Sequence, residues 1–144
     1  MTGYLLDTSI LIDLGNHRLD RHPRVRRWFE EMPADDLFTC TIAIGELARG
    51  VAALPDGPKR RQQSHYLQHT VLPAFRVLPF DLPAALYWGN LMGEGQRSGA
   101  LPPSDDAKIA AIAAVNGLTV ATGNVTDFAR LGVPWLDPGR VPDH

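Results

Sequence analysis

The sequence predicts an α/β fold, in which helices cover a central parallel β-sheet. Short apolar runs alternate along the chain with segments of helical period, which is the order expected of strand–helix–strand crossover units. Acidic residues follow several of these runs, at the positions where a helix would begin. The length of 144 residues suits one domain with its own hydrophobic core, so we expect a single domain over residues 1–144.

The first half of the chain is expected to form three strands with helices between them. In order, the expected elements are strand 3–7, a short helix or turn 8–14, helix 23–32, strand 37–40, a helix that follows Thr41 and includes Val51, helix 59–72 and strand 76–79. Thr41 is placed to cap its helix, whose apolar residues recur at the spacing of one helical face. Pro73 is expected to end helix 59–72, because proline lacks the amide hydrogen that a helix interior uses.

The second half is expected to alternate in the same way. The expected elements are helices 82–97 and 105–116, strand 118–122, helix 124–130 and an edge strand 133–136. Asp81 and Ser104 are placed as N-terminal caps, and Gly117 as a C-terminal cap.

Helix 82–97 has apolar residues on two faces. One stripe consists of Leu82, Ala85, Leu86, Gly89 and Met92, and the other of Ala84, Trp88, Leu91 and Gly95. Such a helix is either deeply buried or part of an oligomer interface. In a domain of this size we favour an interface on the face that bears Trp88 and Leu91, and therefore a homodimer.

Composition excludes several classes of protein. A formal net charge of −2 is wrong for a protein that coats nucleic acid by charge alone, so any such contact must use metal ions or a local basic patch. Two basic runs are present, Arg18, Arg21, Arg24, Arg26 and Arg27 in one and Lys59, Arg60 and Arg61 in the other. The single Cys40 excludes an internal disulfide and is expected in the core. We find neither a signal peptide nor a membrane span, and expect a cytoplasmic protein.

Four acidic residues lie where expected strands give way to helices: Asp7, Glu46, Asp106 and Asp127. Ligands of open parallel sheets gather beyond the carboxyl ends of the strands, so these side chains are expected to meet at one rim. Carboxylates gathered there repel one another and require a compensating positive charge. The pattern therefore predicts a site for a divalent metal ion.

Each acid also has a simpler explanation. Asp7 could cap the next helix, and Glu46 could pair with Arg49 on a helix surface. Asp105 competes with Asp106 as the relevant acid, and Asn124 with Asp127 has the spacing of a capping box.

Other motifs in the sequence give weaker indications of function. His65 and His69 have a zinc-compatible spacing on a helix, but an exposed polar face explains them better. There is no Gly-x-Ser-x-Gly elbow, no phosphate-binding Gly-x-x-x-x-Gly-Lys loop and no Gly-x-Gly-x-x-Gly fingerprint.

The ordered set of segments resembles the PIN-domain family, and most closely its VapC toxins of type II toxin–antitoxin modules. The resemblance rests on Leu6-Asp7-Thr8-Ser9, Ile44-Gly45-Glu46-Leu47, Asp106-Ala107-Lys108-Ile109 and Thr122-Gly123-Asn124-Val125-Thr126-Asp127-Phe128. It implies an α/β/α sandwich with a short parallel sheet and a ribonuclease that depends on Mg²⁺ or Mn²⁺. It also implies a dimer that a cognate VapB-type antitoxin silences, in a higher assembly with that antitoxin.

The resemblance assigns roles to individual residues. Asp7 and Asp106 match the acids that hold the metal most directly, Glu46 matches the second conserved acid of the family, and Asp127 matches the fourth, more variable one. We expect Glu46 and Asp127 to orient the water of that ion or to hold a second ion. Ser9 and Asn124 match supporting polar positions. The chain has Gly123 where many relatives have arginine, so that substrate contact is absent.

On this interpretation, the ion activates water for in-line attack on an RNA phosphodiester. Two rivals stay open. One is a catalytically weak module that binds RNA or an antitoxin. The other is a phosphoaspartyl hydrolase with Asp7 as nucleophile, which would normally require a second aspartate at the place of Ser9.

Overall fold

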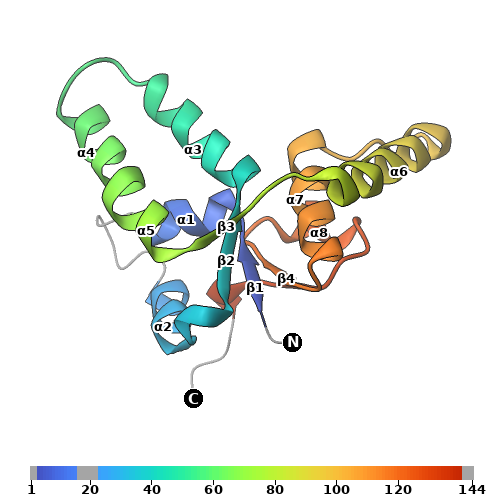
Figure 1. The fold of residues 1–144 in the computed structure, drawn as a ribbon, viewed down its shortest axis with the longest axis horizontal. Coiled ribbons are helices and arrows are strands. Elements are labelled where there is room, and N and C mark those ends of the chain that lie inside the picture. The colour runs from blue at the N-terminus through green and yellow to red at the C-terminus, as the bar shows by residue number, and fades with distance from the viewer. Residues whose placement is uncertain (1–2, 16–22, 141–144) are drawn as a thin grey trace.

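The computed structural model describes residues 3–15 and 23–140 (Figure 1). The strands are β1 (Tyr4–Leu6), β2 (Leu37–Cys40), β3 (Arg76–Leu78), β4 (Thr119–Ala121) and β5 (Trp135–Leu136). The α-helices are α1 (Thr8–Gly15), α2 (Pro23–Glu31), α3 (Thr41–Ala52), α4 (Pro58–Tyr66), α5 (Leu72–Ala74), α6 (Leu82–Ser98), α7 (Ser104–Val115) and α8 (Val125–Ala129). Short turns of other helix types are η1 (Ala34–Asp36), η2 (Leu67–Val71) and η3 (Pro138–Arg140). Arg18 and Arg21 of the first basic run lie outside the described residues.

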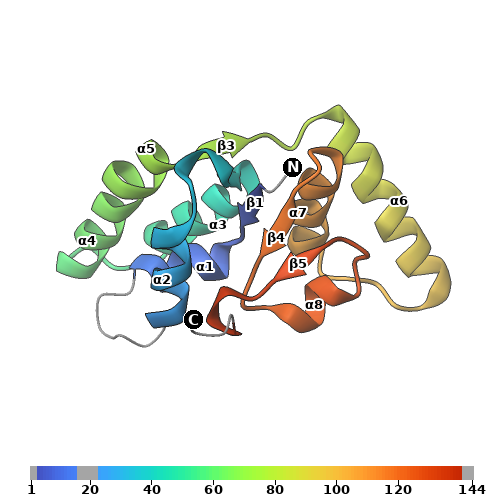
Figure 2. The ribbon, with the colours of Figure 1, turned by 90° about the horizontal axis from the view of Figure 1, so that it is seen from below.

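The five strands form one parallel sheet in the order β3-β2-β1-β4-β5, which confirms the predicted fold class. β1 is the central strand, and Tyr4 pairs with Leu37 of β2 on one side and with Thr119 of β4 on the other. Helices α1 and α2 lie on one side of the sheet, and α6 and α7 on the other (Figures 1 and 2). All five carboxyl ends therefore point to the same edge, as the sequence predicted for the acidic residues.

The core is built on β1, β4 and α7. Both faces of the sheet are covered, so the strands read as continuous apolar runs rather than alternating ones. Helix α7 is buried along most of its length, and its repeated alanines let it pack close to β4. The fully or almost fully buried residues of this region are Leu5, Leu6, Ile109, Ala110, Ala111, Ile112, Ala113, Val120, Ala121 and Phe128.

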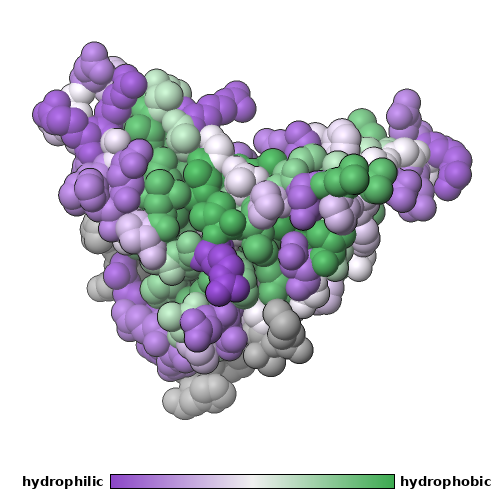
Figure 3. All heavy atoms as spheres, in the orientation of Figure 1, coloured by the Kyte–Doolittle hydropathy of each residue, from purple (hydrophilic) through white to green (hydrophobic). Residues whose placement is uncertain are grey.

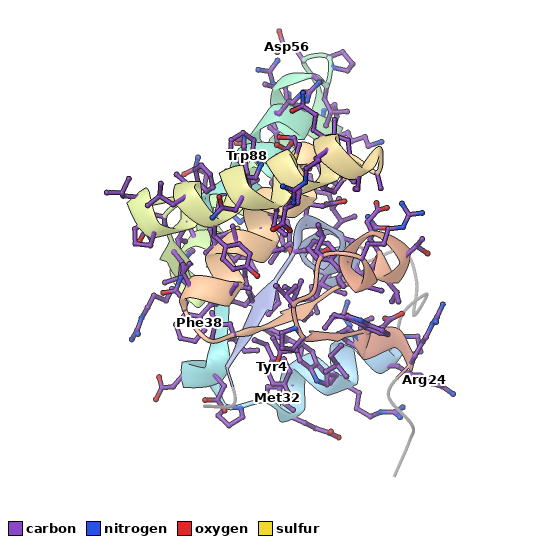
Figure 4. The ribbon with its side chains drawn as sticks, turned by 90° about the vertical axis from the view of Figure 1, so that its right-hand side faces the viewer. Tyr4, Arg24, Met32, Phe38, Asp56 and Trp88 are labelled. Atoms are coloured by element: carbon purple, nitrogen blue, oxygen red, sulfur yellow. The ribbon has the colours of Figure 1, made fainter. Side chains whose placement is uncertain are left out.

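Two helical arms extend from the carboxyl edge of the sheet. One is the hairpin of α3 and α4, and the other is α6, which projects in the opposite direction (Figure 1). Asp56 lies at the tip of the α3–α4 arm (Figure 4). Within the described ranges, no helix combines the length and the apolarity that crossing a bilayer requires.

Some predicted details of the helices were wrong. Thr41 and Ser104 are the first helical residues and make no side-chain cap hydrogen bond. Thr41 instead accepts a hydrogen bond from the Phe80 amide at 3.2 Å. The predicted helix 59–72 is interrupted by the π-helical turn η2, and Pro73 lies inside α5 instead of ending the helix before it.

Other predicted caps are confirmed. The side chain of Asp81 accepts a hydrogen bond from the Ala84 amide at 3.1 Å, which closes the first turn of α6. Gly117 has a φ of +68°, the left-handed conformation that glycine adopts after a helix end.

The two apolar stripes of α6 have different environments. Trp88 and Leu91 are half-buried against the core, so this face packs largely within the domain, and the interface expected on it stays a prediction. Leu82 and Leu86, on the other stripe, are 72% and 64% exposed. The second stripe thus attaches α6 to the domain, and Leu82 and Leu86 of the first stripe are left facing solvent.

Candidate active site

The candidate site begins where the central strands end. Asp7 directly follows β1 and Thr122 directly follows β4, and these strands are paired with Leu6 opposite Ala121. The Asp7 amide continues the ladder by donating to the Ala121 carbonyl at 3.1 Å. Parallel pairing therefore brings the side chains of Asp7 and Thr122 together, although they are far apart in sequence.

Asp7 is almost completely buried, with 4% of its surface exposed. Its Oδ1 accepts hydrogen bonds from the Ser9 hydroxyl at 2.6 Å and the Ile10 amide at 3.2 Å, and its Oδ2 accepts one from the Thr122 hydroxyl at 2.5 Å. Burial raises the pKa of Asp7 above its ordinary value, and these hydrogen bonds offset part of that rise. The bond from Ile10 also caps α1, so the simpler explanation for Asp7 holds together with its place at the rim.

Backbone groups of the loop after β4 fix both hydroxyls that hold Asp7. The Gly123 amide donates to Ser9 Oγ at 3.0 Å, and the Asn124 amide donates to Thr122 Oγ1 at 2.8 Å. A Cβ at position 123 would lie 3.6 Å from Ser9 Oγ, an ordinary contact, so nothing in the local packing requires glycine there.

Glu46 is held from the opposite side of the rim. It lies in the second turn of α3 and is half-buried. The Thr8 hydroxyl donates to Glu46 Oε1 at 2.8 Å, so Thr8 and Ser9 direct two different acids. Within residues 3–15 and 23–140, no ion pair joins Glu46 to Arg49, and the simpler explanation for Glu46 is not found.

Asp106 and Asp127 are joined by the amide of Asn124. Asn124 Nδ2 donates to Asp127 Oδ2 at 2.8 Å and to Asp106 Oδ2 at 3.3 Å. Asn124 occupies the N-cap position of α8 but makes no side-chain cap bond, so the capping-box alternative was wrong. Asp105 is exposed and lies 4.0 Å from the Lys108 ammonium, which leaves Asp106 as the acid that faces this cluster.

The four acids influence one another electrostatically. The pKa of Asp106 is raised to about 7, first by burial, then by hydrogen bonding to and repulsion from Asp127, and further by the charges of Asp7 and Glu46. Burial also raises the pKa of Cys40 to about 11, and the charges of Glu46 and Asp7 add to the rise, so this buried cysteine stays a neutral core thiol. Acids from three other segments thus lie close enough to Asp106 to disfavour its ionised form.

The donor set fits a hard divalent cation. Among the described residues, no Lys, Arg or His ion-pairs with any of the four acids. As the side chains stand, no three His, Cys, Asp or Glu residues within 3–15 and 23–140 are gathered tightly enough to hold a metal ion. Carboxylate oxygens are nevertheless the ligands that Mg²⁺ and Mn²⁺ prefer, and a cation would remove the repulsion that raises the pKa of Asp106.

Thr8 and Thr122 were missed in the sequence. Both are adjacent to predicted site residues or to a predicted strand end, which was the available signal. Their roles depend on strand order and on hydroxyl geometry, neither of which the sequence specifies. The other open motif, His65 with His69, consists of two exposed rings 4.4 Å apart, as expected for a polar face.

An apolar groove adjoins the site at Glu46. It lies between α1, α3 and α4 and has a volume of about 230 Å³. Thr8 and Glu46 form its edge nearest the acids, and its walls include Ile12, Leu47, Val51, Leu54, Tyr66 and Leu67. Figure 3 shows apolar atoms along the inner side of the α3–α4 arm, continuing across the middle of the molecule.

Comparison with known proteins places this geometry in context. The family model described as PIN domain matches residues 4–134. A curated relative, the VapC ribonuclease Y4jK of Sinorhizobium fredii, is 35% identical over 136 residues, which cover 93% of this chain and 96% of that protein.

Solved structures resemble the whole chain. A crystal structure of FitAcB from Neisseria gonorrhoeae has a TM-score of 0.86 at 30% identity, and covers 96% of this chain and 99% of that chain. A member of the VapBC family of toxin–antitoxin systems, VapBC-5 of Mycobacterium tuberculosis, has a TM-score of 0.69 at 31% identity, with 92% of both chains covered.

Proposed function

Since the chain belongs to the PIN-domain family, we propose that it is a metal-dependent endoribonuclease of the VapC type, neutralised by a VapB-like antitoxin. The observation that carries this proposal is the placement of Asp7, Glu46, Asp106 and Asp127 at the carboxyl edge, where burial, and then the neighbouring acids, raise the pKa of Asp106 to about 7. Relatives named as ribonucleases and toxin–antitoxin proteins, matched over almost their whole length, support it.

In this proposal the four acids have two different roles. Asp7 and Asp106 hold a Mg²⁺ or Mn²⁺ ion, and Glu46 and Asp127 orient water or hold a second ion. When bound, the ion supplies acidified water for attack on phosphorus and positive charge beside the phosphate. Ser9 and Thr122 keep the buried carboxylate of Asp7 in one orientation, and Asn124 keeps Asp106 and Asp127 side by side.

The phosphoaspartyl hydrolase is the weaker reading of the same residues. A nucleophilic Asp7 would normally require a second aspartate at position 9. That position is Ser9, whose hydroxyl donates to Asp7 Oδ1.

A cleavage assay on total RNA tests the proposal. Purified protein is expected to cut single-stranded RNA with Mg²⁺ or Mn²⁺, and to lose this activity in excess chelator. Binding of RNA without metal-dependent cleavage would favour the alternative, a catalytically weak module that holds RNA or an antitoxin. Cleavage in excess chelator would contradict the metal-dependent mechanism.

The apolar groove beside Glu46 supports the antitoxin partner. An amphipathic segment could bury apolar side chains against Leu47, Leu54 and Tyr66 while a cationic side chain approaches the uncompensated acids. Such a segment would fill the groove and at the same time block access to the acid site. Co-expression with the product of a small neighbouring gene, followed by co-purification and loss of RNA cleavage, tests this partner.

The exposed stripe of α6 supports a homodimer. Leu82 and Leu86 stand one helical turn apart and expose most of their surface, while Gly89 continues the same face without a side chain. A cytoplasmic location stays a prediction.

A further inference from the structure

A second hollow lies on the other side of the acid site from the apolar groove. It is formed by the C-terminal half of α6, the loop 99–103 and the end of α8, and its volume is about 650 Å³. Ligand pockets in proteins measure roughly 300–1,000 Å³, so a single nucleotide fits this space. The lining residues that matter here are Leu91, Glu94, Arg97, Pro102, Arg130 and Leu131.

One wall of the hollow is held rigidly by the chain reversal after α6. Gly99 has a φ of +78°, and the Ala100 amide donates to the Gly95 carbonyl at 2.8 Å, which makes a glycine-terminated helix end. A Cβ on Gly95 would lie 2.7 Å from Pro102 Cδ and 2.9 Å from the Ala100 carbonyl oxygen, so only glycine lets the loop pack this closely. The loop therefore has a fixed position against α6.

The hollow is directly connected to two of the site acids. Loop 99–103 runs straight into α7, in which Asp106 is the third residue. Arg130 follows Asp127 by three residues and lies directly after the end of α8. A chain bound in the hollow would therefore continue onto the Asp106 and Asp127 side of the rim.

The hollow carries the positive charge that the acid site lacks. Arg97 and Arg130 are both exposed, and across the described part of the chain neither has a carboxylate within ion-pair distance. Glu94 is the one acid in its lining, so the two guanidinium groups leave a net positive charge. Leu91, Pro102 and Leu131 supply an apolar floor beside them.

We propose that this hollow is a subsite for one nucleotide of single-stranded RNA next to the cleaved bond. Arg97 and Arg130 bind its phosphate, and its base packs on the apolar floor. The inference rests on the proposed ribonuclease function, since it specifies how that site holds its substrate. Guanidinium groups suit phosphate oxygens because they offer paired donors, and unpaired bases pack readily on apolar side chains. An acidic protein segment would use the charge but not the floor, so RNA is favoured.

Binding of labelled single-stranded RNA to the inactive Asp7→Asn protein tests the subsite without cleavage. Replacing both arginines with alanine (R97A/R130A) is expected to weaken binding about 10-fold, as two charge-assisted contacts are lost. Each neutralised phosphate of a single strand contributes about 0.7 to the slope of log affinity against log salt, and both arginines bind the same phosphate, so the slope should fall by about 0.7. The double lysine variant (R97K/R130K) should keep most of that slope.

A matched control removes the same charge elsewhere. Lys59 and Arg61 are exposed on α4, at the other arm, and the K59A/R61A variant is expected to bind RNA within about 2-fold of the parent, as distant surface charges are screened by salt. Equal weakening by both double variants would overturn the subsite, as would unchanged binding by R97A/R130A. Competition by polyglutamate as effective as that by unlabelled RNA would overturn it in favour of an acidic protein partner.

Cleavage by the wild-type protein separates the two proposals. In active protein, R97A/R130A is expected to raise KM about 10-fold while kcat changes little, because the contacts bind substrate and transition state alike. If the wild-type protein cuts no RNA with either metal, the ribonuclease proposal fails whatever the binding result. If the wild type cuts RNA and the variant has an unchanged KM, the subsite alone fails.

Discussion

The hydroxyl of Thr122 lies 2.5 Å from Oδ2 of Asp7, across the pairing of the two central strands. The same hydroxyl accepts a hydrogen bond from the Asn124 amide at 2.8 Å, so the donor to Asp7 is itself fixed by the backbone. Ser9 repeats this arrangement on Oδ1, with the Gly123 amide as its own donor. The orientation of one buried carboxylate thus depends on a loop that follows a different strand.

Replacing Thr122 with valine is expected to reduce metal affinity and RNA cleavage about 10- to 100-fold, the usual effect of losing a partner that orients a metal ligand. Valine keeps the shape of threonine but cannot donate to Asp7. Metal affinity is measured by titration calorimetry with Mn²⁺, independently of cleavage.

Thr39 provides the matched control for this variant. It is fully buried like Thr122, but its hydroxyl donates to the Leu6 carbonyl at 2.9 Å and to none of the four acids. Thr39→Val should lower the free energy of unfolding by about 1 kcal/mol and leave Mn²⁺ affinity unchanged. Equal loss of affinity in both valine variants would contradict the role assigned to Thr122.

Replacing Asp7 with asparagine is expected to abolish RNA cleavage and keep the fold. Asparagine retains an oxygen that accepts from Ser9 and the Ile10 amide, and its neutral side chain removes the cost of burying a charge. Thermal unfolding followed by circular dichroism checks the fold, and an RNA assay with Mg²⁺ checks activity. Full activity in this variant would remove Asp7 from the mechanism.

The stability of the metal-free protein is expected to decrease as pH rises from 5 to about 7. The pKa of Asp106 is raised from 3.8 to about 7 on folding, so between these values the folded protein binds more protons than the unfolded chain. Protonation of Asp106 therefore stabilises the folded protein at the acidic end of this pH window. Above about pH 7 this stabilisation is lost. The raised pKa of Asp7 acts in the same direction. Calorimetric unfolding at a series of pH values measures the effect.

Asp106→Asn is the control for this pH dependence. The five histidines also titrate near these pH values, so the difference between wild type and variant isolates the aspartate. The variant should show a flatter dependence and a higher unfolding temperature at pH 8. Mg²⁺ at pH 8 should stabilise the wild type far more than the variant. Identical pH profiles would show that Asp106 is not electrostatically strained.

Replacing Leu86 with glutamate is expected to convert a dimer into a monomer. Leu86 is 64% exposed on α6, so the change should cost the isolated domain little stability but place a charge in an apolar interface. Sedimentation velocity at micromolar concentration measures the mass. Leu101→Glu, at a residue 61% exposed in the loop after α6, is the control and should remain dimeric. A monomeric wild type would contradict the homodimer.

Much of the fold was predictable because it depends on local patterns. Alternating apolar runs and helical periods gave the parallel sheet, and glycine or aspartate at helix ends gave the caps at Asp81 and Gly117. Thr41 and Ser104 failed as caps because each begins its helix one residue earlier than predicted. The π-helical turn η2 buries Leu67 and Val71, and a propensity argument does not contain such tertiary packing.

The candidate site was predictable to the level of residue type and strand end. Asp7, Glu46, Asp106 and Asp127 could be named because parallel strands collect their carboxyl ends at one edge. The threonines that hold Asp7 and Glu46 could not, because their partners lie on other elements. Periodicity gave the two apolar faces of α6 but not which of them meets α7.

The position of β4 beside β1 has a consequence during synthesis. A nascent chain that has left the ribosome only as far as β3 contains Asp7 and Glu46 but neither Thr122 nor the loop that fixes Ser9. The four acids are therefore not all present until translation has passed Asp127, so an unfinished polypeptide lacks part of the proposed metal site.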